Sequence, residues 1–370
     1  MKICVYAICK NELKFVDKWL DNMSEADYIV VLDTGSTDGT YEKLKEDSRV
    51  TKVIQKEIKP WRFDVARNES MTLVPEDTDV FVCTDFDELF EPGWAEHIKQ
   101  NWIVGEHNRG FYTYAWRHNN QGEPQDVFIY DKIHTKDFHW IFPVHEVLQI
   151  NEGIEQRGIN FGKDIYLHHY QDLTKERKYY FDLLELSCKE NPNDSHIRML
   201  LAREYALRQD NKKAIEEFLK VLKMPDIDSS GKKLVLLNSL LQLAFIYESE
   251  KNFDEGIWYC QEFIKEDYTY REPYFLIAEM YNLMKMPTLA EGMVKMGFEY
   301  GIQHYDWVEK GNTWLGWGND LLGVAYFNNG KFEEAKEQME IALKHDPDNA
   351  RLLKNYSSCL RAMLKKNDTI

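Results

Sequence analysis

The sequence lacks the features that would place the protein in a membrane or in an oxidising compartment. No apolar run is long enough to span a bilayer, and the N-terminal apolar run is cut off by Cys9-Lys10-Asn11-Glu12, too early for a signal peptide. The six cysteines are scattered, and none forms a C-x-x-C pair. This distribution favours reduced thiols over a disulfide framework. We therefore expect a cytoplasmic protein without a membrane span.

Positive charge is also scarce, since 46 Lys and Arg face 63 Asp and Glu, for a formal net charge of −17. This excess of acid argues against binding of nucleic acid or of an anionic membrane surface. Neither G-x-G-x-x-G nor G-x-x-x-x-G-K-[ST] occurs, which removes the usual dehydrogenase and P-loop hypotheses. The hydrophobic content of 44% and the length of 370 residues predict folded cores in two domains, residues 1–173 and 174–370.

Apolar runs and helical patterns alternate through the first half of the chain. Such alternation predicts an α/β domain with a parallel, doubly wound sheet, whose ligands bind beyond the carboxyl ends of the strands. The expected strands are Ile3–Ile8, Tyr28–Leu32, Val53–Ile54 and Val80–Cys83, and the expected helices are Asn11–Met23, Thr40–Glu46 and Phe63–Leu73.

Carboxylates follow the ends of these strands. Glu12, Asp33, Asp38 and the pair Asp85 and Asp87 each come just after an apolar run, so one crevice could hold them all. Burying acids at a strand tip is costly unless something pairs them, and oxygen ligands suit Mg²⁺ or Mn²⁺. The structural alternatives are a solvated turn for the D-x-D pair and a turn with a helix cap for Asp33 and Asp38.

Four motifs in this order resemble the family 2 glycosyltransferases with a GT-A (Rossmann-like) fold. They are Lys10-Asn11-Glu12, Asp33-Thr34-Gly35-Ser36-Thr37-Asp38-Gly39-Thr40, the F-D-x-A-R-N-E run that starts at Phe63, and the D-x-D pair. The resemblance implies a nucleotide-sugar donor, with Glu12, Asp33 and Asp38 on the nucleoside. It also implies that Arg67 contacts the diphosphate or the base, and that Asp85 and Asp87 bind the donor sugar and a divalent cation, Mn²⁺ or Mg²⁺.

Two further segments resemble parts of the same family. In Val144-His145-Glu146, His145 is expected to contact the nucleotide-sugar. Glu146 is the candidate general base of an inverting transfer, with Asp126 as the alternative and Asp87 as a further catalytic residue. His168-His169-Tyr170 follows a short expected strand, Ile165–Leu167, and closes the predicted domain. We favour His169 over His168 as the third metal ligand. Arg117 and Lys132 are either phosphate-binding or surface charges.

The second half repeats one frame four times. A small residue is followed by tyrosine three positions later and by another small residue twelve positions later. This frame resembles tetratricopeptide repeats, and it predicts an all-α solenoid. The four instances are Ala202, Tyr205 and Ala214; Ala244, Tyr247 and Gly256; Ala278, Tyr281 and Ala290; and Gly323, Tyr326 and Ala335.

The two resemblances together predict an enzyme similar to bacterial protein or peptide glycosyltransferases. We expect it to move a hexose from a UDP-linked sugar to a polypeptide held by the repeats, through which two copies could also dimerise. One alternative is the same chemistry on a glycan or lipid-linked acceptor for cell-surface polysaccharide. The other alternative is a non-catalytic repeat scaffold.

Overall fold

The computed structural model describes residues 1–118, 122–172, 179–227, 231–304, 306, 308 and 316–367. The chain divides into two compact units, Met1–Glu190 and Asn191–Ile370. The domain boundary expected between residues 173 and 174 lies outside the described residues.

The first unit is built on an eight-stranded sheet with the order β3-β2-β1-β4-β7-β6-β10-β5. Its first four members are parallel, as the alternating pattern predicts. The strands are β1 (Ile3–Cys9), β2 (Tyr28–Asp33), β3 (Lys52–Gln55), β4 (Val80–Cys83), β5 (Glu88–Phe90), β6 (Arg109–His118), β7 (Pro124–His134) and β10 (Gly158–His169), and a separate hairpin pairs β8 (Phe138–Ile141) with β9 (Val147–Ile150).

Both faces of the parallel strands are buried, because alternate side chains join two different cores. Ile3, Val5 and Ala7 pack with helices on one face, and Cys4 and Tyr6 pack under the β8–β9 hairpin on the other. The helices of this unit are α1 (Val16–Met23), α2 (Thr40–Glu46), α3 (Phe63–Met71), α4 (Trp94–Asn101) and α5 (Tyr180–Glu190).

Two sequence predictions for this unit need correction. The helix expected from Asn11 begins only at Val16, because Asn11 is left-handed (φ 57°) and its amide donates to Ser36 Oγ at 2.8 Å. The sheet is mixed rather than purely parallel, since β7 runs antiparallel to both β4 and β6. The helix-strand alternation stops before these strands, so it could not predict their direction.

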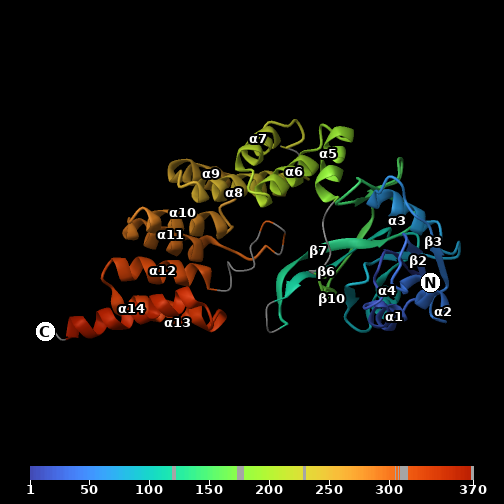
Figure 1. The fold of residues 1–370 in the computed structure, drawn as a ribbon, viewed down its shortest axis with the longest axis horizontal. Coiled ribbons are helices and arrows are strands. Elements are labelled where there is room, and N and C mark those ends of the chain that lie inside the picture. The colour runs from blue at the N-terminus through green and yellow to red at the C-terminus, as the bar shows by residue number, and fades with distance from the viewer. Residues whose placement is uncertain are drawn as a thin grey trace. The chain divides into compact units, whose positions relative to one another are not determined.

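The second unit consists of helical hairpins, and the predicted repeat frame falls on four of them (Figure 1). Each first helix carries the small residue and the tyrosine, and each second helix carries the later small residue. The pairs are α6 (Ser195–Leu207) with α7 (Asn211–Val221), α8 (Lys233–Ser249) with α9 (Phe253–Glu266), α10 (Glu272–Leu283) with α11 (Pro287–Tyr300), and α12 (Trp317–Asn328) with α13 (Phe332–His345), followed by α14 (Ala350–Asn367).

The turn inside each hairpin has one backbone geometry. The residue seven positions after the first small residue is left-handed, with φ between 59° and 75°. The next amide donates to the carbonyl of the frame tyrosine at 2.8 to 3.0 Å, which satisfies a helix-end carbonyl. The same turn four times confirms the repeat at the level of the backbone. The left-handed residues are Gln209, Lys251, Lys285 and Gly330.

Small residues let the paired helices approach closely. A Cβ on Gly256 would lie 2.8 Å from Met280 Sδ and 3.3 Å from the carbonyl oxygen of Ala244, which is the first small residue of the same repeat. A Cβ on Gly323 would lie 2.9 Å from Met339 Cγ. These distances are shorter than van der Waals contact, so larger side chains would separate the helices.

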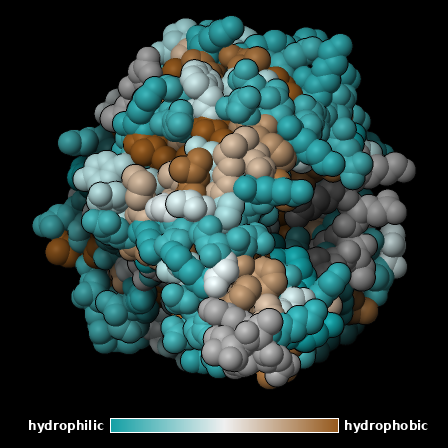
Figure 2. Space-filling model, turned by 90° about the vertical axis from the view of Figure 1, so that its left-hand side faces the viewer, coloured by the Kyte–Doolittle hydropathy of each residue, from teal (hydrophilic) through white to brown (hydrophobic). Residues whose placement is uncertain are grey.

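The surface in Figure 2 is largely hydrophilic, with hydrophobic side chains in small patches between polar areas. Within the described ranges, no helix combines the length and the apolar character needed to cross a bilayer. All six cysteines are buried.

Candidate active site

The parallel strands bring the predicted acids to one edge of the sheet. Cys9 at the end of β1 pairs in register with Asp33 at the end of β2, and Tyr6 pairs with Cys83 at the end of β4. Asp85 and Asp87 follow β4 directly. The carboxyl ends of three strands therefore lie at one edge of the sheet, where ligands bind in this topology.

Asp33 is fully buried and orders the loop that follows it. Its Oδ1 accepts hydrogen bonds from the amides of Gly35 (2.9 Å) and Ser36 (2.8 Å) and from Gln55 Nε2 (3.0 Å). Burial opposes its charge, but the hydrogen bonds from Ser36, Gln55 and Gly35 outweigh it and lower the pKa of Asp33. The left-handed Gly35 (φ 111°) permits the tight turn.

Asp38 and Glu12 join the start of α2 to the end of β1. Asp38 accepts from the amide of Thr40 (3.0 Å), from its hydroxyl (2.6 Å) and from the amide of Leu13 (3.1 Å). The amide of Glu12 donates to Thr40 Oγ1 at 2.9 Å. Asp38 thus stabilises the turn before α2, which was the structural alternative for this residue. The nucleoside contacts of Glu12, Asp33 and Asp38 remain predictions.

Arg67 on α3 lies at the centre of a second group of site residues and is only 3% exposed. Its Nη2 donates to Asp85 Oδ1 at 2.9 Å, its Nε to Glu146 Oε1 at 2.5 Å, and its Nη1 to Cys83 Sγ at 3.1 Å. The guanidinium also lies 5.2 Å from the ring centroid of Trp140. Two predicted site acids that are far apart in the chain therefore share one buried cation.

Lys132 is a second buried cation, which excludes the surface interpretation for this residue. It is 5% exposed, and its Nζ lies 3.4 Å from Asp85 Oδ2 and 3.5 Å from Glu88 Oε1. Glu88 accepts from the amide of Asp85 (2.9 Å) and from the hydroxyl of Tyr114 (2.9 Å). Burial opposes ionisation of Asp85, but Arg67 and Lys132 outweigh it and hold the pKa of this carboxyl far below its usual range.

The sequence does contain a signal for the burial of Lys132. Phe128, Tyr130, Lys132 and His134 alternate along β7 and share one face of the strand. A lysine in line with two aromatic side chains predicts a buried charge and hence a carboxylate partner. No comparable pattern in the sequence indicates that Glu88 is buried.

Asp87 contacts His169, and not the neighbouring His168. Asp87 Oδ2 lies 3.5 Å from His169 Nε2, and His169 Nδ1 donates to the carbonyl of Trp116 at 3.2 Å. Burial opposes protonation of His169, but the Asp87 carboxylate outweighs it and raises the pKa of the imidazole. His168 contacts His118 (2.9 Å) and Glu91 (3.3 Å) instead.

The predicted metal trio is not assembled as three ligands. Among the residues that the structure describes, no three His, Cys, Asp or Glu side chains are gathered closely enough to hold a metal ion. Asp85 is engaged by Arg67 and Lys132, whereas Asp87 and His169 face each other. A metal role for these residues stays a prediction.

The remaining predicted residues lie in two places. His145, left-handed at φ 52°, and Glu146 precede β9, and the ring of His145 packs edge-on against Tyr180 at 5.7 Å. Asp126, the alternative base, forms a cross-strand ion pair with Arg117 at 2.5 Å. Arg117 is 57% exposed there, so it is a surface charge.

Residues 4–145 match the family model "Glycosyl transferase family 2", and residues 318–349 match the family model "Tetratricopeptide repeat". No curated protein sequence matches the chain significantly.

The chain is also similar to solved tetratricopeptide repeat proteins. MamA shares 18% identity over 47% of this chain and 85% of its own, with a TM-score of 0.37. YrrB, described as having an unusual peptide-binding site, shares 14% over 50% and 84%, with a TM-score of 0.38. A thermophilic repeat protein from Thermus thermophilus shares 19% over 50% and 90%, with a TM-score of 0.34.

The α/β fold with a carboxylate-rich sheet edge agrees with the first family match, and the four hairpins with one turn geometry agree with the second. The chain therefore carries a family 2 glycosyltransferase domain at residues 4–145 and a tetratricopeptide repeat at residues 318–349.

Proposed function

We propose that the protein transfers a hexose, with inversion and in a metal-dependent reaction, from a UDP-linked sugar to a polypeptide. The observation that carries this proposal is the cluster after β4, where Arg67 and Lys132 hold Asp85 next to the Asp87–His169 pair. A nucleoside diphosphate leaving group develops negative charge, and preorganised cations stabilise such charge best where water is excluded.

Asp87 and His169 have the donor chemistry that a divalent cation requires. A carboxylate oxygen and an imidazole nitrogen both suit Mn²⁺. The Nδ1–H of His169 is anchored on the Trp116 carbonyl, which directs Nε2 toward Asp87, as in many metal-binding histidines. When bound, a cation at this pair would neutralise charge on the diphosphate. Asp85, held by Arg67 and Lys132, would orient the donor.

Glu146 is the proposed base, with Asp126 as the alternative. In an inverting transfer, the acceptor oxygen forms a bond to the anomeric carbon while the bond to the diphosphate oxygen breaks, and a carboxylate takes the acceptor proton. Arg67 fixes the orientation of Glu146, whose side chain is 11% exposed. Asp126 lies in an ion pair on the β6–β7 hairpin and has no contact with the Arg67 cluster in the described residues.

The repeats support a polypeptide acceptor, because helical solenoids hold extended peptides. A glycan or lipid-linked acceptor is the alternative for the same chemistry. Mass spectrometry after incubation with a panel of UDP-sugars distinguishes the two kinds of acceptor. A mass increase on a peptide supports the polypeptide acceptor, and a modified glycan supports the glycan or lipid-linked acceptor.

Thermal unfolding with nucleoside diphosphates tests the enzyme proposal. A ligand at a hundred times its dissociation constant stabilises the folded state by about 2.7 kcal/mol. We expect UDP with Mn²⁺ to raise the melting temperature more than UDP with EDTA. If no nucleotide gives a metal-dependent shift, the protein is instead a repeat scaffold with an inactive transferase domain.

The adjacent histidines give a matched pair of variants. Asp87→Ala and His169→Ala should abolish transfer and the Mn²⁺-dependent part of the shift while the protein stays folded. His168→Ala should keep both, because His168 does not contact Asp87. Transfer by Asp87→Ala at the wild-type rate would rule out its metal role.

A further inference from the structure

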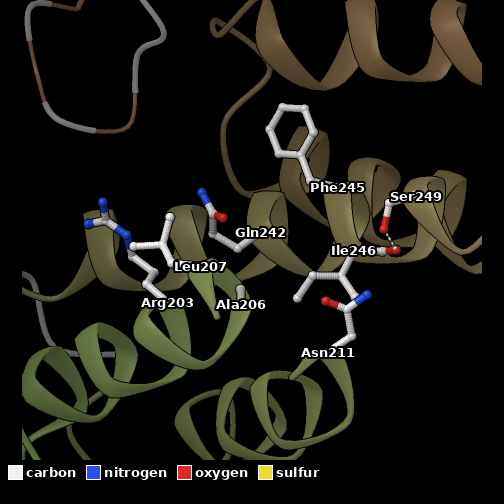
Figure 3. A pocket seen from close by; sticks show the side chains of 8 residues that line it. All are labelled: Arg203, Ala206, Leu207, Asn211, Gln242, Phe245, Ile246 and Ser249. Atoms are coloured by element: carbon white, nitrogen blue, oxygen red, sulfur yellow. Dashed lines mark hydrogen bonds between the residues drawn. The ribbon is translucent and has the colours of Figure 1, made fainter. Parts of the chain in front are cut away.

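A cavity of about 350 Å³ opens between the first two hairpins of the second unit. Figure 3 shows Arg203 and Leu207 reaching it from α6, and Gln242 and Phe245 from α8. Arg203 directly follows Ala202, and Phe245 directly follows Ala244, so both occupy the same position of the repeat frame. The cavity therefore lies on the face that the first helices of the repeats share.

The side chain of Arg203 has no hydrogen bond and no ion pair to any residue in the described part of the chain. Its side chain is half-buried, and burial lowers the pKa of the guanidinium, while no carboxylate of the described residues lies close enough to raise it. Other arginines of α6 and its C-terminal end are paired: Arg198 donates to Glu217 at 2.7 Å, and Arg208 to Glu204 at 2.9 Å. Arg203 is thus a desolvated cation for which the described residues supply no counter-charge.

The groups beside Arg203 can hold the rest of a peptide. The side-chain amide of Gln242 has no partner among the described residues. It can donate to a peptide carbonyl and accept from a peptide N–H. Phe245 is half-buried, and Leu207 is 74% exposed, so both offer apolar surface next to the charge.

We propose that this cavity binds an extended peptide through one acidic residue, whose carboxylate pairs with Arg203 while its backbone meets Gln242 and a neighbouring apolar side chain covers Phe245 and Leu207. A planar guanidinium pairs with carboxylates through two parallel hydrogen bonds, which gives geometric specificity. Because the chain carries a formal net charge of −17, peptides with many acids are repelled, and a single acidic residue is preferred.

The acceptor role of such a peptide rests on the proposed glycosyl transfer, but the binding does not. Binding is therefore measured without nucleotide, metal or turnover. Loss of the nucleotide shift with intact peptide binding would refute the proposed function alone, and the reverse result would refute this site alone.

The experiment uses the full-length protein and an array of peptides of about twelve residues, a length that suits an extended peptide in a solenoid groove. Each peptide has a central Glu, Asp, Gln or Asn between random flanking residues. We expect the bound peptides to be enriched in Glu and Asp over the two amides. The strongest binder and its Gln counterpart are then compared by fluorescence anisotropy, where a charged hydrogen-bonded pair predicts roughly a tenfold to hundredfold difference in affinity.

Variants of α6 and its C-terminal end assign the effect to Arg203. In Arg203→Gln, the Glu peptide should bind no better than the Gln peptide, and Arg203→Lys should restore part of the difference. Arg208→Gln, which removes a nearby charge outside the cavity, should bind like the wild type. Unchanged melting of Arg203→Gln shows that the fold is intact.

Several results would overturn the site: no bound peptide in the array, no enrichment of Glu and Asp, or equal affinity of wild type and Arg203→Gln for the Glu peptide. Phe245→Ala provides an independent measurement. It should weaken the Glu and Gln peptides by the same factor, because it removes apolar contact and no charge. An effect on the Glu peptide alone would also contradict the proposal.

Discussion

Two arginines, one in each unit, are withdrawn from solvent under opposite conditions. Arg67 is 3% exposed and has two carboxylates, a thiol and an aromatic ring around it. Arg203 is half-buried and contacts no carboxylate of the described chain. A buried charge that the fold neutralises belongs to a preorganised site, whereas one that it leaves alone depends on a ligand for its partner.

The largest expected effect concerns the paired arginine. Arg67→Ala leaves Asp85 and Glu146 without their shared cation, and breaking a buried ion pair costs about 3–5 kcal/mol. Urea unfolding followed by tryptophan fluorescence should show this loss. Arg117→Ala, which breaks an ion pair on the surface, should lose about 1 kcal/mol or less. Equal losses in both variants would contradict a buried network at Arg67.

Close packing in the second unit is tested by two glycines of α11. A Cβ at Gly297 would lie 2.7 Å from Phe275 Cε1 and 3.1 Å from Tyr274 Cβ, so Gly297→Ala should destabilise by about 1–3 kcal/mol. Gly292 has no atom within 4 Å of that position, and Gly292→Ala should stabilise by about 0.5–1 kcal/mol. Thermal unfolding measures both, and the same sign for both would refute the tight approach at Gly297.

His134 shows how the first unit buries an ionisable group without charge. Its Nε2 accepts from Tyr6 OH at 2.6 Å, its Nδ1 donates to the Thr135 carbonyl at 2.7 Å, and burial lowers its pKa from 6.5 to about 3. Between these values the unfolded chain binds the extra proton, so stability falls as the pH falls through this window. The loss between about pH 7 and pH 5 should be about 2 kcal/mol.

Urea melts at pH 7 and pH 5 measure this pH dependence. His134→Gln should reduce the difference between the two values, even if the variant is less stable at both. His139→Gln, at an exposed position of β8, should leave it unchanged. A wild-type pH difference that persists in His134→Gln would assign the acid sensitivity to other groups.

The smallest effect belongs to the unpaired arginine. Arg203→Met should leave the free energy of unfolding unchanged or raise it by about 1 kcal/mol at most, because it removes a desolvated charge without breaking an ion pair. Arg198→Met, on the same helix, breaks the pair with Glu217 and should lower stability. If Arg203→Met destabilised the protein more than Arg198→Met, the fold would depend on Arg203 in a way that its contacts do not show.

Periodicity along the chain predicted most of the elements in the first unit. Val80–Cys83 and Thr40–Glu46 have the predicted bounds, because the apolar pattern and the flanking polar residues are local signals. Strands β5 to β10 were largely missed, apart from a short part of β10. Their long hairpin carries a mixed pattern, and strand direction depends on pairing partners rather than on local sequence.

The candidate site was predicted as a list of residues but not as a set of contacts. The D-x-D pair, Arg67, Glu146 and His169 all lie at the sheet edge or contact residues there. The different partners of Asp85 and Asp87 were not foreseen, since they depend on Lys132 and on which histidine turns toward Asp87.

Local order along the chain thus determined four parallel strands, three of them with acids at their ends, and four hairpins in one repeat frame. The tertiary structure alone decided which charges are paired. Arg67 meets Glu146 across 79 positions of sequence, and Lys132 meets Asp85 across 47, because the sheet folds them together. Hydrophobic periodicity records which side of an element is buried, but it does not record which charge lies opposite that side. For Arg203, no carboxylate of the described chain lies there.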